Sequence, residues 1–422
     1  MKKVLSILFL ITTFVFAADA ELDIVKKSGS MPKIEVSVAP NAMNKPLTQK
    51  VAKMIEKDLM VSGHFEVVKA SQVVDYNSNP DMLVLSIKGT DLFVNVSSNV
   101  SSFGGYSVMV KMYDSNSKKM VFNRTFSTSK EDRYPFVAHR IAIRINKYLN
   151  APPIDWMDKF VIFSQYKSAK KADIIIADYT LTFQMPVIRG GLNIFPKWAN
   201  SKQDSFYYTT YDSGIPTLIK TNIYTRQRET IMRSEGMIVA SDVSEDEKKV
   251  LITASPNHQP DIYLYNTVNK TKKRLTTYKG IDVGAHFVDN EKRIVFVSDR
   301  LKYPNIFAKD IGGRGVERLV YHGNNNSSAT TYKDYVVYTS RDRNNEFGSY
   351  TFNLYLMSTK SDFLKRLTSN GSNQFPKFSK DGESIIFLKT VNNRSSIGIL
   401  RLNYSKSFTF PLANGKIQSI DW

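Results

Sequence analysis

The pattern of apolar and polar residues divides the chain into a mixed N-terminal part and a long repetitive C-terminal part. In the first part, Ile34–Val38 alternates and is rich in β-branched residues, which predicts a strand. Leu47–Val61 instead has apolar residues at helical spacing, and Gly63 is placed to end that helix. The same spacing predicts a second long helix over Pro135–Leu149.

Shorter apolar segments complete the first domain. Phe65–Val68 and Met82–Ile87 are interpreted as strands, and the segments 106–113 and 121–126 as a hairpin around a polar turn. We therefore expect an α/β domain over residues 33–150. The Ala-Pro-Pro sequence that begins at Ala151 predicts a stiff linker over residues 151–158.

A repeat fills residues 159–422. A bulky residue, a polar turn and an apolar strand recur at intervals of 43 to 48 residues. The bulky residues are Trp198, Val243, Phe287, Phe378 and Trp422, with a weaker match near Thr330. Each interval contains four predicted strands, which is typical of a blade of a β-propeller.

The order of these strands predicts the number of blades and how the ring closes. The strand with the bulky residue occurs six times and ends at Trp422, whereas the apolar strand that follows the turn first occurs at Phe160–Phe163. The segment Ile417–Trp422 is therefore expected to complete the blade that residues 160–188 begin. The predicted fold is an α+β N-terminal domain followed by an all-β six-bladed β-propeller closed by the C-terminal strand.

Residues 1–20 have the pattern of a secretory signal peptide. Lys2 and Lys3 precede the uncharged run Val4–Ala18, and Ala18–Ala20 forms a small-x-small cleavage pattern. The alternative is a membrane anchor, but this run is shorter than the roughly 20 residues that a spanning helix needs. We expect a soluble exported protein, because no later run is long and apolar enough to span a bilayer.

Charge and cysteine content narrow the classes of function. Lysine and arginine number 58 against 39 acidic residues, a net charge of +19 that by itself suggests a nucleic acid or another anionic partner. Export argues against nucleic acid and leaves envelope polymers, lipid headgroups and acidic proteins. The absence of cysteine excludes disulfides, thiol catalysis and a cysteine-linked lipid anchor.

Motifs for catalysis are missing from the sequence. There is no G-x-S-x-G, no P-loop and no H-E-x-x-H, and the five histidines are isolated from one another. We therefore predict no catalytic, cofactor-binding or metal-binding residue and no cofactor. Recurring arginines such as Arg274, Arg318 and Arg366 are expected to be structural. Two alternatives stay open: a propeller enzyme of the lactonase or peptidase kind, and a peptidoglycan-binding module.

Several stretches resemble one known family, TolB, the soluble periplasmic component of the Tol–Pal envelope system. They are Ile55–Val67, Tyr106–Tyr113, Pro135–Leu149 with its Ala138-His139 pair, and Ala172–Asp178. The order of signal, α/β domain and propeller is also similar over the full length. The blade turns depart from the usual S-P-D-G, and only Ser379–Gly382 comes close to it.

The resemblance implies a non-enzymatic, monomeric scaffold in the periplasm. Such proteins bind the peptidoglycan-associated lipoprotein Pal over the mouth of the propeller channel, and their N-terminal segment binds the C-terminal domain of TolA. They maintain outer-membrane integrity and help constrict the envelope at cell division, and colicins capture some of them at the Pal site.

Two groups of binding residues follow. Residues 21–32 are expected to form a flexible partner-binding segment whose TolA-binding part is Glu21, Leu22, Asp23, Ile24 and Val25. This part could add a strand to a partner's sheet, or else be the docked first strand of the domain. The loops that enter the innermost strands ring the channel and are expected to contact Pal. Their residues are Met237, Ile238, Val239, Ile281, Asp282, Val283, His286, Asn325, Asn326, Asn373 and Gln374.

Overall fold

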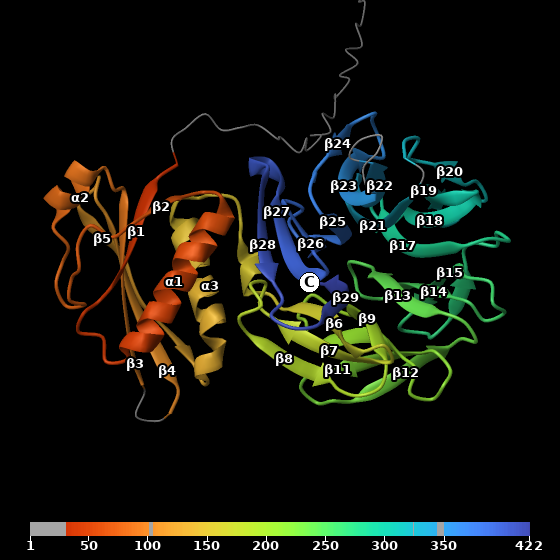
Figure 1. Cartoon of the computed structure of the whole chain (residues 1–422), viewed down its shortest axis with the longest axis horizontal. Helices are drawn as coiled ribbons and strands as arrows, with labels where there is room; N and C mark the ends of the chain where they lie inside the picture. The colour runs from red at the N-terminus through yellow and green to blue at the C-terminus, as the bar shows by residue number, and fades with distance from the viewer. Residues whose placement is uncertain (1–30, 101–103, 324, 344–349) are drawn as a thin grey trace, which may run out of the picture.

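A five-stranded sheet with two long helices on one face forms the N-terminal domain (Figure 1). The computed structural model describes residues 31–100, 104–323, 325–343 and 350–422. The sheet order is β2-β1-β3-β4-β5, with β1 parallel to β2 and β3 and the other pairs antiparallel. The elements are β1 Lys33–Val38, α1 Lys45–Ser62, β2 Glu66–Val68, α2 Met82–Lys88, β3 Leu92–Val100, β4 Tyr106–Asp114, β5 Lys119–Thr128 and α3 Tyr134–Tyr148.

Local signals explain the boundaries of the first long helix. The side chain of Asn44 accepts a hydrogen bond from Leu47 N at the start of α1, and Gly63 ends it with a left-handed φ of 78°. The buried stripe of α1 packs with that of α3 against the sheet, in a core that includes Val51, Ile55 and Ile141. Both predicted long helices, the first predicted strand and the hairpin are confirmed.

The prediction of a strand at Met82–Ile87 is wrong, because this segment is the helix α2. Asp81 caps it by accepting hydrogen bonds from Leu83 N and Val84 N, and the left-handed Gly89 ends it. Leu85 is the one buried residue of α2. The segment is therefore not buried on both faces, as a central strand would be. The strand in this region is β3, which the sequence patterns missed.

Six four-stranded antiparallel sheets form a ring in the described part of the second domain (Figure 1). Five of them are continuous in sequence. The first two are β9 Asn193–Trp198, β10 Ser205–Thr210, β11 Thr217–Asn222 and β12 Arg228–Arg233, and then β13 Ile238–Val243, β14 Lys249–Ala254, β15 Asp261–Asn266 and β16 Lys272–Arg274. The next two are β17 Asp282–Val288, β18 Arg293–Leu301, β19 Tyr303–Asp310 and β20 Glu317–Arg318, and then β21 Asn326–Tyr332, β22 Tyr335–Arg343, β23 Tyr350–Ser358 and β24 Leu364–Arg366. The fifth is β25 Ser372–Phe378, β26 Ser384–Val391, β27 Arg394–Arg401 and β28 Lys406–Pro411.

The sixth blade joins the two ends of the propeller sequence. The C-terminal strand β29 (Lys416–Asp421) pairs with β6 (Val161–Ser168), which is followed by β7 (Lys171–Ala177) and β8 (Gln184–Ile188). This is the closure that the repeat pattern predicted. It confirms the six-bladed propeller and leaves the ring without an open seam at its ends.

The two domains meet through a buried charged cluster. Helices α1 and α3 lie between the sheet and the propeller (Figure 1) and contribute Asp58 and His139, while Asp178 and Tyr179 follow β7 of the propeller. His139 Nδ1 lies 2.8 Å from Asp58 Oδ2, and His139 Nε2 lies 3.5 Å from Asp178 Oδ2. Tyr179 donates a 2.6 Å hydrogen bond to Asp58 Oδ1. All four side chains are fully buried.

Burial by itself would lower the pKa of the His139 imidazole. The charges and hydrogen bonds of Asp58 and Asp178 outweigh burial and raise that pKa to about 9. His139 is therefore a cation at neutral pH, held between one carboxylate of its own domain and one of the propeller.

Candidate functional site

The innermost strands of the six blades create a channel with a cavity at one end. Strands β9, β13, β17, β21, β25 and β29 contact one another in turn around the ring, and all of them run away from the same end of the channel. We call that end the mouth. A cavity of about 260 Å³ opens there. Its apolar lining includes Phe195, Pro196, Met237, Val239, Val283 and Phe375, and its basic lining is Lys197, His286 and Lys377.

Bulges in the inner strands place two phenylalanines at the mouth. Pairing with the second strand of the blade shifts register in each inner strand, and Phe195 and Phe375 lie at the shifts in β9 and β25. Both have left-handed φ angles, 55° and 51°, as do Ser328 and Gly284 at the matching positions. A bulky residue rarely adopts this conformation, and such backbone strain is concentrated at functional sites.

Deeper in the channel, one register position of each inner strand forms a ring of mostly ionisable side chains. We call it the channel ring. Its members are Lys197, Asp242, His286, Thr330, Lys377 and Asp421. In five blades this residue stands immediately before the bulky residue, whereas Thr330 precedes Thr331. In β9 and β25 it comes two residues after the mouth phenylalanine.

The two lysines of the channel ring have opposite electrostatic environments. Lys197 Nζ lies 3.1 Å from Asp421 Oδ1 and 3.5 Å from Asp242 Oδ1. Burial lowers its pKa, but these two carboxylates outweigh burial and raise it above the ordinary value. For Lys377, burial and the nearby Lys197 cation lower the pKa to about 8, against the weaker opposing effect of Asp421 and Asp242. Both lysines are charged at neutral pH, but carboxylates hold only Lys197.

The histidine of the channel ring is neutral at neutral pH. Burial and the Lys377 cation lower the pKa of His286 to about 4, against the opposing effect of Asp242, whose Oδ2 lies 3.6 Å away. His286 can therefore donate one hydrogen bond and accept another in the channel, but it contributes no charge.

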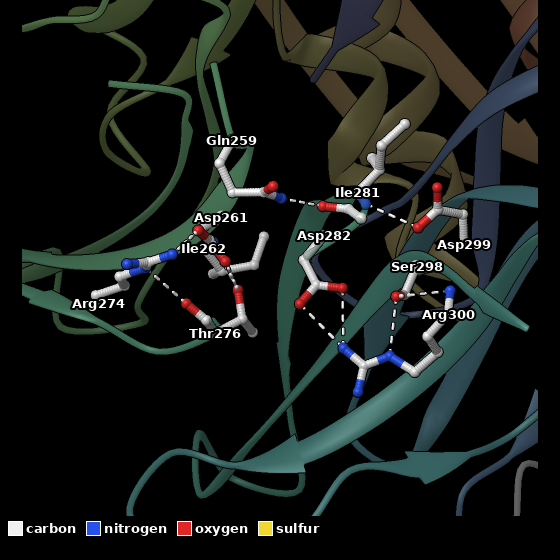
Figure 2. Close-up of polar contacts among 11 residues, drawn as sticks. Gln259, Asp261, Ile262, Arg274, Thr276, Ile281, Asp282, Ser298, Asp299 and Arg300 are labelled. Carbon is white, nitrogen blue, oxygen red and sulfur yellow. Dashed lines mark hydrogen bonds and ion pairs between the residues drawn. The ribbon is translucent and has the colours of Figure 1, made fainter. Parts of the chain in front are cut away.

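The loop before β17 is held rigidly at the mouth (Figure 2). Gln259 donates a hydrogen bond to the carbonyl oxygen of Gly280 from one side, and Ile281 N donates a 2.7 Å bond to Asp299 Oδ1 on the other. A side chain at Gly280 would collide with Asp299, since a Cβ there would lie 2.2 Å from Oδ1. The loop therefore presents Ile281, 46% exposed, in one fixed position.

Ion pairs fasten the strands beneath this loop (Figure 2). Both carboxylate oxygens of the fully buried Asp282 lie within 3.0 Å of Arg300 Nη2. In the preceding blade, Asp261 of the third strand β15 forms an ion pair with Arg274 of the outer strand β16. These arginines stabilise the blades.

Arginines of the outer strands repeat one further contact. Arg274, Arg318 and Arg366 each donate from Nε to the carbonyl oxygen two residues further along the chain. This repeated bond is the structural role that their recurrence predicts.

The predicted mouth residues fall into three groups. Those that line the cavity are Met237, Val239, Val283 and His286. Those that are exposed or half-buried outside its lining are Ile281, Asn325 and Gln374. Those that are buried within the blades are Ile238, Asp282, Asn326 and Asn373. The predicted TolA-binding residues Glu21–Val25 lie outside the described residues.

The two buried asparagines support the mouth loops from beneath. Asn326 Nδ2 donates to His322 O at 2.8 Å, and Asn373 Nδ2 donates to Asn370 O at 3.0 Å. Each side chain therefore ties the loop before an inner strand to the start of that strand.

The cavity residues that sequence reasoning missed include two phenylalanines and two lysines: Phe195, Phe375, Lys197 and Lys377. A signal was present, because F-P-K stands immediately before the bulky residue in both blades. Comparing these positions across the repeats would have found them, whereas strand alternation alone would not, because the register shifts at each phenylalanine.

Exposed apolar side chains gather on the loops at the mouth end. Within the described residues, the loops before the inner strands lie at this end, as do the adjoining ends of the second and third strands. Exposed apolar side chains in these loops and strand ends include Ile215, Ile281, Leu301, Tyr303, Tyr321 and Tyr350. Apolar and aromatic side chains around a cavity are typical of a surface that binds another macromolecule.

The described residues contain neither a candidate metal site nor a membrane-spanning helix. Within them, no group of three or more His, Asp or Glu side chains could hold a metal ion. No helix in the same ranges is long and apolar enough to cross a membrane.

An α/β domain fastened to a closed six-bladed propeller defines a class of two-domain propeller proteins, and comparisons identify the family within it. A model of the TolB amino-terminal domain matches residues 20–121, and one of the TolB beta propeller domain matches residues 159–422. The Tol-Pal system protein TolB of Wolinella succinogenes is 48% identical, and that of Campylobacter jejuni 41%, each over 100% of both chains. The chain belongs to the TolB family.

A solved structure has the same architecture. TolB from Acinetobacter baumannii superposes with a TM-score of 0.76 at 21% identity, covering 93% of this chain and 96% of that one. The shared fold therefore includes both domains.

Proposed function

We propose that the chain is a non-enzymatic periplasmic scaffold of the Tol–Pal system. It binds a Pal-like lipoprotein through the propeller mouth and the C-terminal domain of TolA through residues Glu21–Val25. In this role it maintains outer-membrane integrity and assists constriction of the envelope at cell division. Membership of the TolB family supports the choice of system.

The observation that carries the Pal assignment is the construction of the mouth. A cavity lined by Phe195, Phe375 and other apolar residues opens within a rim of exposed apolar side chains. The loop that presents Ile281 is held by hydrogen bonds from both sides, so little ordering is needed when a partner binds. Rigid apolar anchors of this kind support a protein-binding role.

The test of the Pal assignment measures binding of the soluble domain of the organism's own Pal-like lipoprotein by isothermal titration calorimetry. Replacing Ile281→Asp should weaken binding by roughly tenfold or more, since a charge would enter the apolar contact. Tyr224→Asp is the matched control, because Tyr224 is 70% exposed on the turn between β11 and β12, at the opposite end of the propeller. No binding by the unaltered protein would refute the assignment.

The TolA assignment has a separate test. Deleting residues 21–30 should abolish binding of the TolA C-terminal domain and leave affinity for the Pal-like domain unchanged. Unchanged TolA affinity after the deletion would contradict the assignment to this segment.

A further inference from the structure

The charges of the channel ring are balanced in number but not in position. Lys197 contacts both carboxylates, Asp242 and Asp421, within 3.5 Å. Among the described residues, Lys377 has no carboxylate oxygen within 4.0 Å, and its ammonium group makes no hydrogen bond to any of them. The cavity therefore contains one paired lysine and one lysine without an acceptor.

The surroundings of Lys377 compensate for this only in part. The Lys197 cation repels it and His286 is neutral at neutral pH, while Asp421 and Asp242 attract it only from beyond 4.0 Å and do not outweigh burial. A cation that has lost part of its hydration and has no partner raises the free energy of the unbound protein. A carboxylate that enters the channel would remove this penalty.

The residues along the path into the channel determine which partner segment can bring a carboxylate to Lys377. Lys377 lies two residues beyond Phe375 on β25, and Lys197 lies two residues beyond Phe195 on β9. All four side chains line the same cavity. A side chain that reaches Lys377 from the mouth therefore passes the two phenylalanines. These favour an apolar residue next to the carboxylate that enters the channel.

We propose that the channel is a carboxylate receptor: a protruding loop of the partner that the mouth binds inserts an aspartate or glutamate between Phe195 and Phe375 and pairs it with Lys377. The inference rests on the proposed function, since the partner is the Pal-like lipoprotein. An acidic loop also matches the net charge of +19 of the receptor chain.

The experiment uses the full chain and the soluble domain of the Pal-like lipoprotein. Lys377→Met should lower affinity by ~30-fold or more, because it removes one partner of an ion pair that is desolvated on binding. The same variant should melt at an equal or higher temperature than the unaltered protein, since it removes a cation without a partner. A lysine with a purely structural role would instead give unchanged affinity and a lower melting temperature in Lys377→Met. Lys406→Met is the control, on the exposed outer strand β28 of the same blade.

A charge exchange identifies the inserted group. Lys377→Glu should abolish binding, and one Asp→Lys or Glu→Lys substitution on the Pal-like domain should restore it. Equal affinity of the unaltered protein, Lys377→Met and Lys377→Glu would overturn the inference and leave the proposed function standing. No binding by the unaltered protein would overturn both.

A free anion is the other source of the same chemistry. The pKa of the Lys377 ammonium group, followed by NMR, should stay unchanged in 10 mM inorganic phosphate and rise when the Pal-like domain binds. A rise with phosphate together with unchanged Pal affinity in Lys377→Met would show a small-anion site instead and would overturn the proposal.

Discussion

The cluster that joins the two domains makes a quantitative prediction for His139→Gln. His139 is a buried cation between Asp58 and Asp178, and glutamine has a similar size but no charge. The substitution leaves two buried carboxylates facing each other without the cation that separates them. We expect the protein to lose stability while keeping its fold.

Two routes give the size of the loss. Removing one partner of a buried ion pair costs about 3–5 kcal/mol. Independently, the pKa of His139 is about 9 in the folded protein against 6.5 for a free imidazole, a difference worth about 3 kcal/mol. Because folding raises this pKa, the stabilisation is complete below pH 6.5 and is lost as the pH rises towards 9.

Urea unfolding followed by tryptophan fluorescence, at pH 6.5 and again at pH 9, measures both effects. The variant should be less stable than the unaltered protein by about 3 kcal/mol at the lower pH and by much less at the higher one. His258→Gln is the control, because the His258 side chain is 83% exposed. A loss that is below 1 kcal/mol at pH 6.5, or equal at both pH values, would refute the reasoning.

Three further variants test the mouth and the closure of the propeller. Phe375→Gly should leave stability within about 1 kcal/mol, because relief of left-handed strain offsets the lost contacts and added chain freedom, while Pal affinity falls roughly tenfold. Asp282→Asn should lower stability by about 3 kcal/mol, because the buried partner of Arg300 loses its charge. Removing Lys416–Trp422 should lower the melting temperature by ~10 °C or more, since β29 buries Ile417 and Ile420 in the last blade.

For each of these three variants, one outcome would contradict the prediction. A large loss of stability in Phe375→Gly would show that this side chain holds the fold and does not serve the mouth. For Asp282→Asn, the control is the exposed Asp212→Asn, and equal stability of the two variants would contradict a structural ion pair. For the chain without Lys416–Trp422, calorimetry measures the melting temperature. An unchanged value would mean that closure of the propeller adds no stability.

The repeat pattern predicted the propeller well because a blade is a local unit. Its four strands are adjacent in sequence, and the same residue types recur at each turn. The N-terminal domain was harder. Met82–Ile87 is apolar and short enough for either a strand or a helix, and the capping side chain of Asp81 decides between them. The central strand β3 was missed, although residues 92–98 are buried without a break.

Prediction of the site succeeded in location and failed in detail. The loops before the inner strands do surround the mouth, but Met237, Val239, Val283 and His286 are the predicted residues that line the cavity. Bulges turn the inner strands locally, so an alternating pattern does not show which side chains face the channel. The phenylalanines and lysines of the F-P-K segments escaped notice for this reason.

By itself the sequence determined the elements that depend on near neighbours, which are the two long helices and the four-stranded repeat. Counting the repeats also gave the six blades and the closing strand. Only the tertiary structure decided which charges meet. His139 finds Asp58 and Asp178 across the domain joint, and Lys197 takes both carboxylates of the channel ring and leaves Lys377 without one. The physical reason is that periodicity records which face of an element is buried, whereas the pairing of charges depends on distances between residues far apart in the chain.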